Sequence, residues 1–197
     1  MPTVEVPLCG HGTLAASHAL YTEHNEKAAE LLFETASGTL KVAKAGEGYR
    51  LDFPEAGAWE TLNDPAFAEA LGAEPSVVMK GKFMIAVVDS EATVRALKPD
   101  LTAVAKLPGD EMVVTAPGEA TDFVSRMFGP KIGIPEDPFT GATHTMLAPY
   151  WSKRLGKTKL TAHQASARGG DVVCEVAGDR VFLFGNAVTT MRGQMAF

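Results

Sequence analysis

The feature that most constrains the fold of this chain is an internal repeat of a predicted β-hairpin. The stretch LKVAKAGEGYRLDF at residues 40–53 resembles VVCEVAGDRVFLF at residues 172–184 when one residue is gapped. The glycines of the two predicted turns, Gly46 and Gly178, align with each other. Chance similarity between two hairpins is the alternative interpretation. Because a helix signal precedes each hairpin as well, we favour a duplication that places two similar halves face to face.

Each predicted helix opens from a glycine. The two openings are GHGT at residues 10–13 and GATH at residues 141–144. Residues 14–20 (LAASHAL) are apolar on nearly every side, which predicts a buried helix. Free backbone N–H groups and the helix dipole favour an anion at such a helix start. Two facing starts would hold a carboxylate between them, although a Gly-x-Gly-Thr motif alone is also typical of a tight turn.

The two halves differ in what precedes the glycine. Residues 76–140 precede the second glycine with strand, helix and strand signals, whereas nine residues precede Gly10. If the halves are duplicates, the first lacks its opening strand, helix and strand. We therefore expect an α+β protein with an incomplete first domain at residues 1–74 and a second domain at residues 75–197. Unpaired strand edges in the first domain predict self-association, which we expect to give a homodimer.

Two segments are ambiguous on periodicity alone. DFVSRMF at residues 122–128 fits either a strand or a helix. Pro149 lies inside the helix-like run MLAPYWSKRL, which predicts a kink there or a helix start close to it.

Composition and charge exclude several classes of function. A net charge of −6 without a basic stripe argues against nucleic-acid binding. The sequence shows no signal peptide and no apolar run long enough to span a bilayer, so we expect no membrane partner. Cys9 and Cys174 are far apart and form no CxxC pair, which argues against a zinc site and a disulfide framework. We therefore expect reduced thiols in a cytoplasmic protein without a bound metal.

Two residues near the glycine openings can carry acid–base chemistry. His11 lies between two glycines, and a histidine there can donate, accept or titrate near neutral pH. Asp137 lies in a loop bounded by prolines, PKIGIPEDPFTGATHT at residues 130–145. The spacing leaves open whether Asp137 is a turn residue or a carboxylate used in general acid–base catalysis. A structural role is likewise the alternative to a ligand contact for His11.

Two spaced motifs carry a resemblance to a known family. Residues 2–16 (PTVEVPLCGHGTLAA) resemble the first signature of the phenazine-biosynthesis PhzF-like proteins, and residues 136–145 (EDPFTGATHT) resemble the second, usually Glu-Asp-Pro-x-Thr-Gly-Ser-Ala-His. Shorter segments follow the same pattern along essentially the whole chain: DFVSR (122–126), LAPYW (147–151), LGK (155–157) and RGG (168–170).

The resemblance implies the diaminopimelate-epimerase fold, in which two pseudo-symmetric halves each wrap a β-barrel-like sheet around a central helix. It implies isomerisation of a small carboxylate-bearing metabolite by proton transfer, without a cofactor, in the cleft between the halves. Carried over position by position, it assigns catalytic roles to His11 and Asp137. It assigns substrate contacts to residues of the two helix starts: Cys9, Gly10, Gly12, Thr13, Gly141, Ala142 and Thr143.

The sequence departs from the family pattern in two places. The serine of the second signature is replaced by Ala142, and the neighbouring Thr143 is a candidate to supply the missing hydroxyl. The family's catalytic glutamate lies in an Asn-x-Ser-Glu-Thr-like stretch that has no counterpart in these 197 residues. We therefore expect an N-terminally shortened isomerase with impaired activity. The alternative is a non-catalytic protein that binds small anions or a partner with the same fold.

Overall fold

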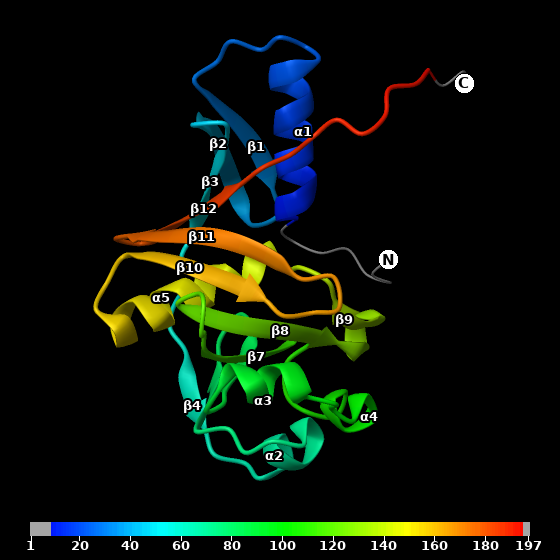
Figure 1. Ribbon diagram of the computed structural model, residues 1–197, viewed down its shortest axis with the longest axis vertical. Coiled ribbons are helices and arrows are strands. Elements are labelled where there is room, and N and C mark those ends of the chain that lie inside the picture. The colour runs from blue at the N-terminus through cyan, green and yellow to red at the C-terminus, as the bar shows by residue number, and fades with distance from the viewer. Residues whose placement is uncertain (1–8, 195–197) are drawn as a thin grey trace.

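The computed structural model describes residues 9–194, which fold as a mixed α+β structure (Figure 1). Five α-helices and two short 3₁₀ helices are present in this range, in addition to the strands. They are α1 (Gly10–Thr22), α2 (Ala66–Leu71), α3 (Glu91–Ala96), α4 (Leu101–Val104), η1 (Pro130–Ile132), η2 (Gly141–Thr143) and α5 (His144–Leu155).

The strands of the described range form one continuous, mostly antiparallel sheet of twelve strands. Along the sheet they follow the order β1-β2-β3-β12-β11-β10-β8-β7-β6-β5-β4, and β9 pairs with β8. Their bounds are β1 Glu30–Thr35, β2 Gly38–Ala45, β3 Gly48–Pro54, β4 Glu60–Leu62, β5 Val77–Lys80, β6 Met84–Val87, β7 Met112–Pro117, β8 Phe123–Gly129, β9 Ile134–Asp137, β10 Lys159–Gln164, β11 Gly170–Ala177 and β12 Arg180–Gly185.

The repeated hairpins meet at the centre of the molecule. The β2–β3 hairpin and the β11–β12 hairpin lie edge to edge, because β3 pairs antiparallel with β12 and Leu51 faces Leu183. Both turns carry a glycine with positive φ, 59° at Gly46 and 63° at Gly178, a backbone conformation that glycine adopts without steric cost. The pairing confirms two pseudo-symmetric halves, each built on a helix and the hairpin that follows it.

The second half encloses its helix. Seven side chains of α5 are buried, and the helix packs against β10, β11 and β12. Pro149 lies inside this helix, so its ring nitrogen cannot donate to the carbonyl of Thr145. That carbonyl instead accepts a hydrogen bond from the backbone N–H of Ala56, at 3.0 Å. A segment between the two halves therefore satisfies the group that the proline leaves free, and α5 begins at His144, ahead of the proline.

The first helix is not buried, contrary to the prediction. Only Ser17 and Tyr21 of α1 are buried, and the exposed face carries Ala15 and Ala16. The helix contacts β2, β3 and η2, so one side is covered, and Figure 1 shows it at the top of the molecule beside the β1–β3 strands. The prediction is wrong because a run of small apolar side chains does not require burial: alanine is also compatible with an exposed helix surface.

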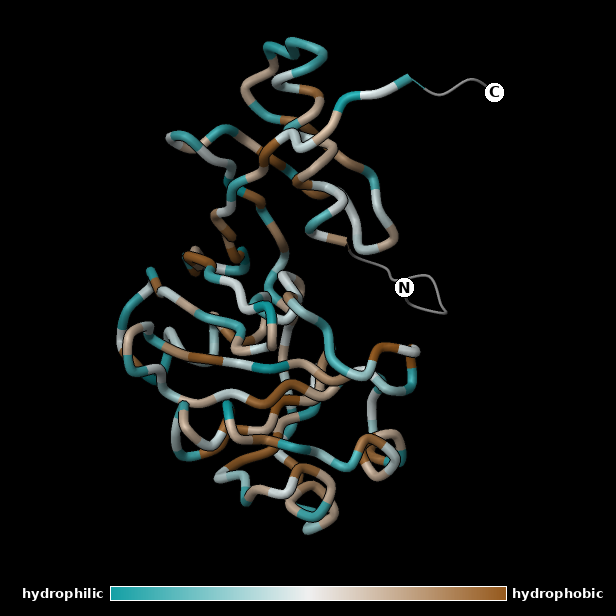
Figure 2. The backbone as a smooth tube through the Cα atoms, turned by 45° about the vertical axis from the view of Figure 1, so that its right-hand side comes forward, coloured by the Kyte–Doolittle hydropathy of each residue, from teal (hydrophilic) through white to brown (hydrophobic). Residues whose placement is uncertain are grey.

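The remaining elements form a second core in the lower part of the molecule. Helices α2, α3 and α4 pack there on one face of the β5–β8 strands, and Figure 2 shows long hydrophobic stretches in the strands of this region. The ambiguous segment at residues 122–128 is strand β8. The predicted loop at 130–145 contains η1, β9 and η2. None of the helices in residues 9–194 combines the length and apolar character needed to cross a membrane.

The division into domains at residues 74 and 75 stays a prediction. The pairing of strands across that boundary is nevertheless clear, because β4 pairs with β5 and α2 packs against α4. Residues 60–71 therefore contact elements that follow them in the sequence.

Candidate active site

A cavity of about 420 Å³ lies where the start of α1 faces the loop that leads into α5. Cys9, Gly10 and His11 line it from the first half. The second half contributes residues from β8, η1 and β9, from the segment that leads into α5, and from the segments that precede β6 and β7. These are Lys82, Phe83, Gly109, Asp110, Glu111, Met127, Ile132, Ile134, Asp137, Phe139, Thr140 and Ala142.

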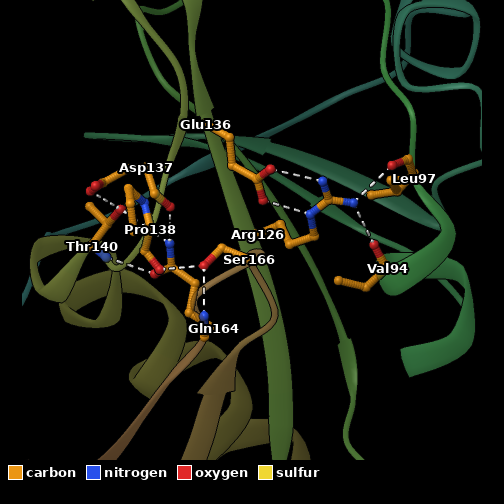
Figure 3. A network of polar contacts seen from close by, with 10 residues as sticks. Val94, Leu97, Arg126, Glu136, Asp137, Pro138, Thr140, Gln164 and Ser166 are labelled. Atoms are coloured by element: carbon orange, nitrogen blue, oxygen red, sulfur yellow. Dashed lines mark hydrogen bonds and ion pairs between the residues drawn. The ribbon is translucent and has the colours of Figure 1, made fainter.

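The Asp137 carboxylate is held in place by its own loop. The Thr140 hydroxyl donates a hydrogen bond to Asp137 Oδ2 at 2.6 Å. The buried side chain of Gln164 clamps the same loop, since its Nε2 donates to the Asp137 carbonyl at 2.8 Å and its Oε1 accepts from the Thr140 N–H at 2.7 Å. Figure 3 shows this network, in which Ser166 donates to the Pro138 carbonyl at 2.6 Å. The carboxylate is thus oriented before any ligand arrives.

A partly buried ion pair fixes the strand that carries Asp137. Arg126 on β8 binds Glu136 on β9 through two hydrogen bonds, Nε to Oε1 at 2.7 Å and Nη2 to Oε2 at 3.0 Å. Its Nη1 also donates to the carbonyls of Val94 and Leu97, at 3.2 and 2.8 Å (Figure 3). Such a two-point contact between a guanidinium and a carboxylate is geometrically specific. Glu136 therefore has a structural partner, and Asp137 is the carboxylate of this pair that faces the cavity.

The start of α1 supplies the opposite wall. The Thr13 hydroxyl donates to the Cys9 carbonyl at 2.9 Å, which closes the first turn. Gly12 lies so close to Cys9 that an added Cβ atom would stand 3.1 Å from the thiol sulfur. His11 is exposed at the cavity, and its ring packs edge-on against Phe139 with centroids 5.5 Å apart. The histidine can therefore reach a ligand from solvent and from the cavity.

Phe139 separates the larger cavity from a smaller one of about 240 Å³. The smaller cavity also touches Gly10 and His11, and its other walls include Gly141, Arg168 and several apolar side chains. The Phe139 ring leans on Gly170, where an added Cβ atom would stand only 2.3 Å from it. The Phe139 ring therefore leaves no room for a side chain at position 170.

His144 lies behind this wall and is fully buried. Its ring stacks on Phe139, with centroids 5.7 Å apart. Its Nδ1 lies 3.1 Å from the Thr140 carbonyl and therefore carries the proton, because a carbonyl oxygen can only accept. Burial lowers the pKa of His144 to about 4, so the ring is neutral near pH 7. It supports the loop and has no contact with the larger cavity.

The sequence profile of the phenazine biosynthesis-like proteins matches residues 1–193. The chain belongs to this family. It is similar to an uncharacterized isomerase of Pseudomonas aeruginosa, with 44% identity over 98% of this chain and 75% of the relative. It is also similar to a mouse phenazine biosynthesis-like domain-containing protein, at 34% identity and the same coverage.

Solved structures agree with this assignment. A PhzF-family protein of Enterococcus faecalis superposes with a TM-score of 0.91 at 40% identity, over 98% of this chain and 75% of that protein. A predicted epimerase of Pseudomonas aeruginosa, at 19% identity and a TM-score of 0.62, covers 92% of this chain and 72% of its own and shows the fold alone. The epimerase-like fold expected from the sequence is therefore confirmed.

Most residues predicted for the site of this PhzF-like chain lie together. Cys9, Gly10, His11, Asp137 and Ala142 line the larger cavity, and Gly141 lines the smaller one. Thr13 and Thr143 direct their hydroxyls to backbone carbonyls: Thr143 donates to the Thr140 carbonyl at 2.8 Å, and neither residue lines a cavity. Gly12 lines neither cavity. The catalytic and substrate-binding roles assigned to these residues stay predictions.

Sequence reasoning missed several wall residues. Lys82 and Glu111 lie in segments that carry no motif, and the fold alone brings them to the cavity. Arg168 belongs to the RGG segment of the resemblance but was assigned no role there, and it lines the smaller cavity. Thr140 could have been found, because a threonine three residues after an aspartate in a proline-bounded loop is typical of a side-chain hydrogen bond. Within residues 9–194 no three His, Cys, Asp or Glu side chains are grouped to hold a metal ion.

Proposed function

We propose that the larger cavity isomerises a small carboxylate-bearing metabolite by proton transfer, with Asp137 and His11 as its catalytic residues and without a cofactor. The observation that carries the proposal is the placement of both groups on one cavity, one from each helix start. Asp137 is a pre-oriented carboxylate that can accept a proton from an activated carbon. His11 can donate a hydrogen bond to charge that develops on the substrate.

The helix starts supply the binding site for the substrate carboxylate. Gly10 and His11 open α1, and Gly141 and Ala142 open the turn that continues into α5. Backbone N–H groups at a helix start favour an anion, and the glycines let a ligand approach them closely. In the proposed binding mode the carboxylate is held by these groups, which leaves the neighbouring C–H bond between His11 and Asp137.

The proposal is tested by solvent deuterium incorporation. The chain is incubated in D₂O with a panel of the proteinogenic L-amino acids, their 2-hydroxy analogues and unsaturated dicarboxylates, and loss of each C–H signal is followed by NMR. We expect incorporation into a subset of the panel, reduced about 10²- to 10⁴-fold in Asp137→Asn, because a positioned acid–base group typically contributes that much. Asp179→Asn, a change in an exposed hairpin turn, is the control. Incorporation that is equal in wild type and Asp137→Asn would contradict the proposal.

We also expect turnover by these 197 residues to be slow, since they contain no counterpart of the family's acidic stretch. A specific observation favours the binding-protein alternative as well. Ala142 has a methyl group where the family has a serine hydroxyl. The hydroxyl of the neighbouring Thr143 does not replace it, because it donates to the Thr140 carbonyl. Benzoate that perturbs the amide signals of Gly10 and Gly141, with no panel compound exchanging, is the result that this alternative predicts.

The expected homodimer is part of the proposal. Strand β1 lies at one edge of the described sheet, and Leu32 on it is 63% exposed. An edge strand with an exposed apolar side chain favours pairing with another chain. Light scattering at micromolar concentration should give twice the monomer mass, and Leu32→Lys should shift the mass toward the monomer. A wild-type monomer at all concentrations would contradict this expectation.

A further inference from the structure

Glu111 is a wall residue of the larger cavity to which no motif assigns a role. It directly precedes β7, and its carbonyl accepts a hydrogen bond from the Met84 N–H at 3.0 Å, which ties its backbone to the parallel neighbour strand β6. Its side chain lines the same cavity as Asp137 and His11. The sheet thus holds a second carboxyl group at the cavity by a rigid backbone, independently of the loop that carries Asp137.

The two carboxyl groups differ in their partners. Asp137 accepts a hydrogen bond from Thr140, whereas no hydrogen bond or ion pair engages the Glu111 carboxyl within residues 9–194. Glu111 is partly buried, so the protein shields it from water without replacing the water by donors. A shielded carboxyl without donors favours its neutral form. Glu111 is therefore suited to carry a proton, and Asp137 to accept one.

The two neighbouring carboxylates of the cavity also favour the neutral form of Glu111. Burial raises the pKa of Glu111, and the nearby carboxylates of Asp137 and Asp110 raise it further, while the Lys82 ammonium opposes them. The other titratable groups on the cavity wall are the exposed His11 and Cys9 at the start of α1. Three acidic groups share one cavity with one lysine, so like-charge repulsion disfavours full ionisation of the carboxyls.

We propose that Glu111 is a second proton-transfer residue of this cavity and returns to the substrate a proton at a position other than the one from which Asp137 removes it. This inference rests on the proposed function and adds the group that an isomerisation still needs. The Asp137 carboxylate takes a proton from a substrate carbon next to a C=C bond, and the electron pair of that C–H bond is delocalised over the double bond as a dienolate. The Glu111 carboxylic acid then donates its proton to a second carbon, where the electron pair forms the new C–H bond.

The step is balanced and needs no further reactant. One proton leaves the substrate and one is added, so the product is an isomer. Asp137 ends protonated and Glu111 ends ionised, and exchange of protons with water in the open cavity restores the starting state. The alternative role for Glu111 is binding of a substrate ammonium group as a permanent carboxylate, which requires Glu111 to be ionised at neutral pH.

A titration of the free protein tests the inference without any ligand. The side-chain ¹³C carboxyl signal of Glu111, assigned by its loss in Glu111→Gln, is followed by NMR from pH 3 to pH 9. We expect a midpoint above the ordinary pKa of a glutamate and a lower midpoint in Asp137→Asn, because that change removes a neighbouring negative charge. A midpoint at or below the ordinary value, or one that Asp137→Asn leaves unchanged, would overturn the inference and favour the ammonium-binding role.

Exchange measurements give the second readout, on an unsaturated dicarboxylate of the panel that incorporates deuterium, because a conjugated compound offers a second carbon for the proton. In Glu111→Gln we expect removal of the substrate proton to continue, while formation of the isomer falls about 10²-fold, since glutamine cannot donate a carboxylic proton. Asp137→Asn loses both reactions. Glu47→Gln, a change in an exposed hairpin turn, is the matched control and leaves both rates unchanged. Equal loss of both reactions in Glu111→Gln would refute a separate role for Glu111, whereas equal activity in Asp137→Asn and wild type would refute the proposed function instead.

Discussion

The two helices that open onto the cavity, α1 and α5, occupy equivalent places in the repeat and differ in how they are held. Helix α5 is enclosed, with seven buried side chains, a buried histidine at its first position and a clamped loop in front of it. Helix α1 has two buried side chains and an exposed histidine at its second position. The two helix starts are therefore similar in sequence, but the start of α5 is enclosed by the protein and the start of α1 is open to solvent.

This difference assigns the two helix starts different parts in the chemistry. The acid–base carboxylate needs a fixed position, and the network around Gln164 and Thr140 provides it. The histidine needs access to ligand and solvent, and the open face of α1 provides that. The following changes break or sharpen the contrast, beginning with the one of largest expected effect.

Trp151→Ala should be the most damaging change in α5. The indole is buried, stacks on Phe123 with centroids 5.9 Å apart, and donates from Nε1 to Thr115 Oγ1 at 3.0 Å. Its removal leaves a large cavity and takes one donor from the Thr115 hydroxyl, which still donates to the Val124 carbonyl, at a cost of about 3–5 kcal/mol in the free energy of unfolding. Leu20→Ala on the half-buried side of α1 is the comparison and should cost less than about 2 kcal/mol. Urea denaturation measures both, and equal losses would contradict the contrast between the helices.

The buried His144 should make α5 sensitive to acid. Its pKa is about 4 in the folded protein and 6.5 for the free side chain, so the unfolded chain binds more protons between these values. Stability from this group is therefore complete above pH 6.5 and falls as the pH drops toward 4, by about 3 kcal/mol in all. His144→Asn should remove that part of the pH dependence while keeping a donor to the Thr140 carbonyl. Denaturation curves at several pH values measure it, and identical slopes for both proteins would refute it.

Tyr21→Phe should have the smallest effect, because it tests one hydrogen bond on the buried side of α1. The Tyr21 hydroxyl donates to the Val42 carbonyl at 3.3 Å, and the ring stacks on Tyr49 with centroids 6.0 Å apart. The phenylalanine keeps the ring contact, so we expect a loss of about 1 kcal/mol. Thermal denaturation measures this change. A loss as large as that of Trp151→Ala would mean that α1 is held as firmly as α5.

Local signals in the sequence predicted much of the fold. The repeat identified both hairpins, because the positive φ at Gly46 and Gly178 requires a residue without a side chain. Two helix ends also carry local signals, since the Ser90 side chain caps α3 and Gly72 ends α2 in the left-handed conformation. The exposure of α1 was not predictable from its composition, because the solvent accessibility of a helix face depends on what packs against it.

The candidate site was predicted only where it coincides with a motif. His11 lies between two glycines and Asp137 lies in a loop bounded by prolines, and both residue types mark turns and loops in a sequence. Glu111 and Lys82 reach the cavity because β6 and β7 pair in parallel and begin side by side. This contact spans 29 residues of sequence, and no local pattern encodes it. Their contribution could be recognised only once the sheet was known.

A double-mutant cycle on solvent deuterium incorporation tests most directly whether the two helix starts form one catalytic unit. The rate of incorporation into the most reactive panel compound is measured for wild type, His11→Asn, Asp137→Asn and the double variant. If both residues act in one proton transfer, the double variant should be less than about tenfold slower than the slower single variant, because groups that act as a unit are not additive. A loss equal to the product of the two single losses would contradict the account.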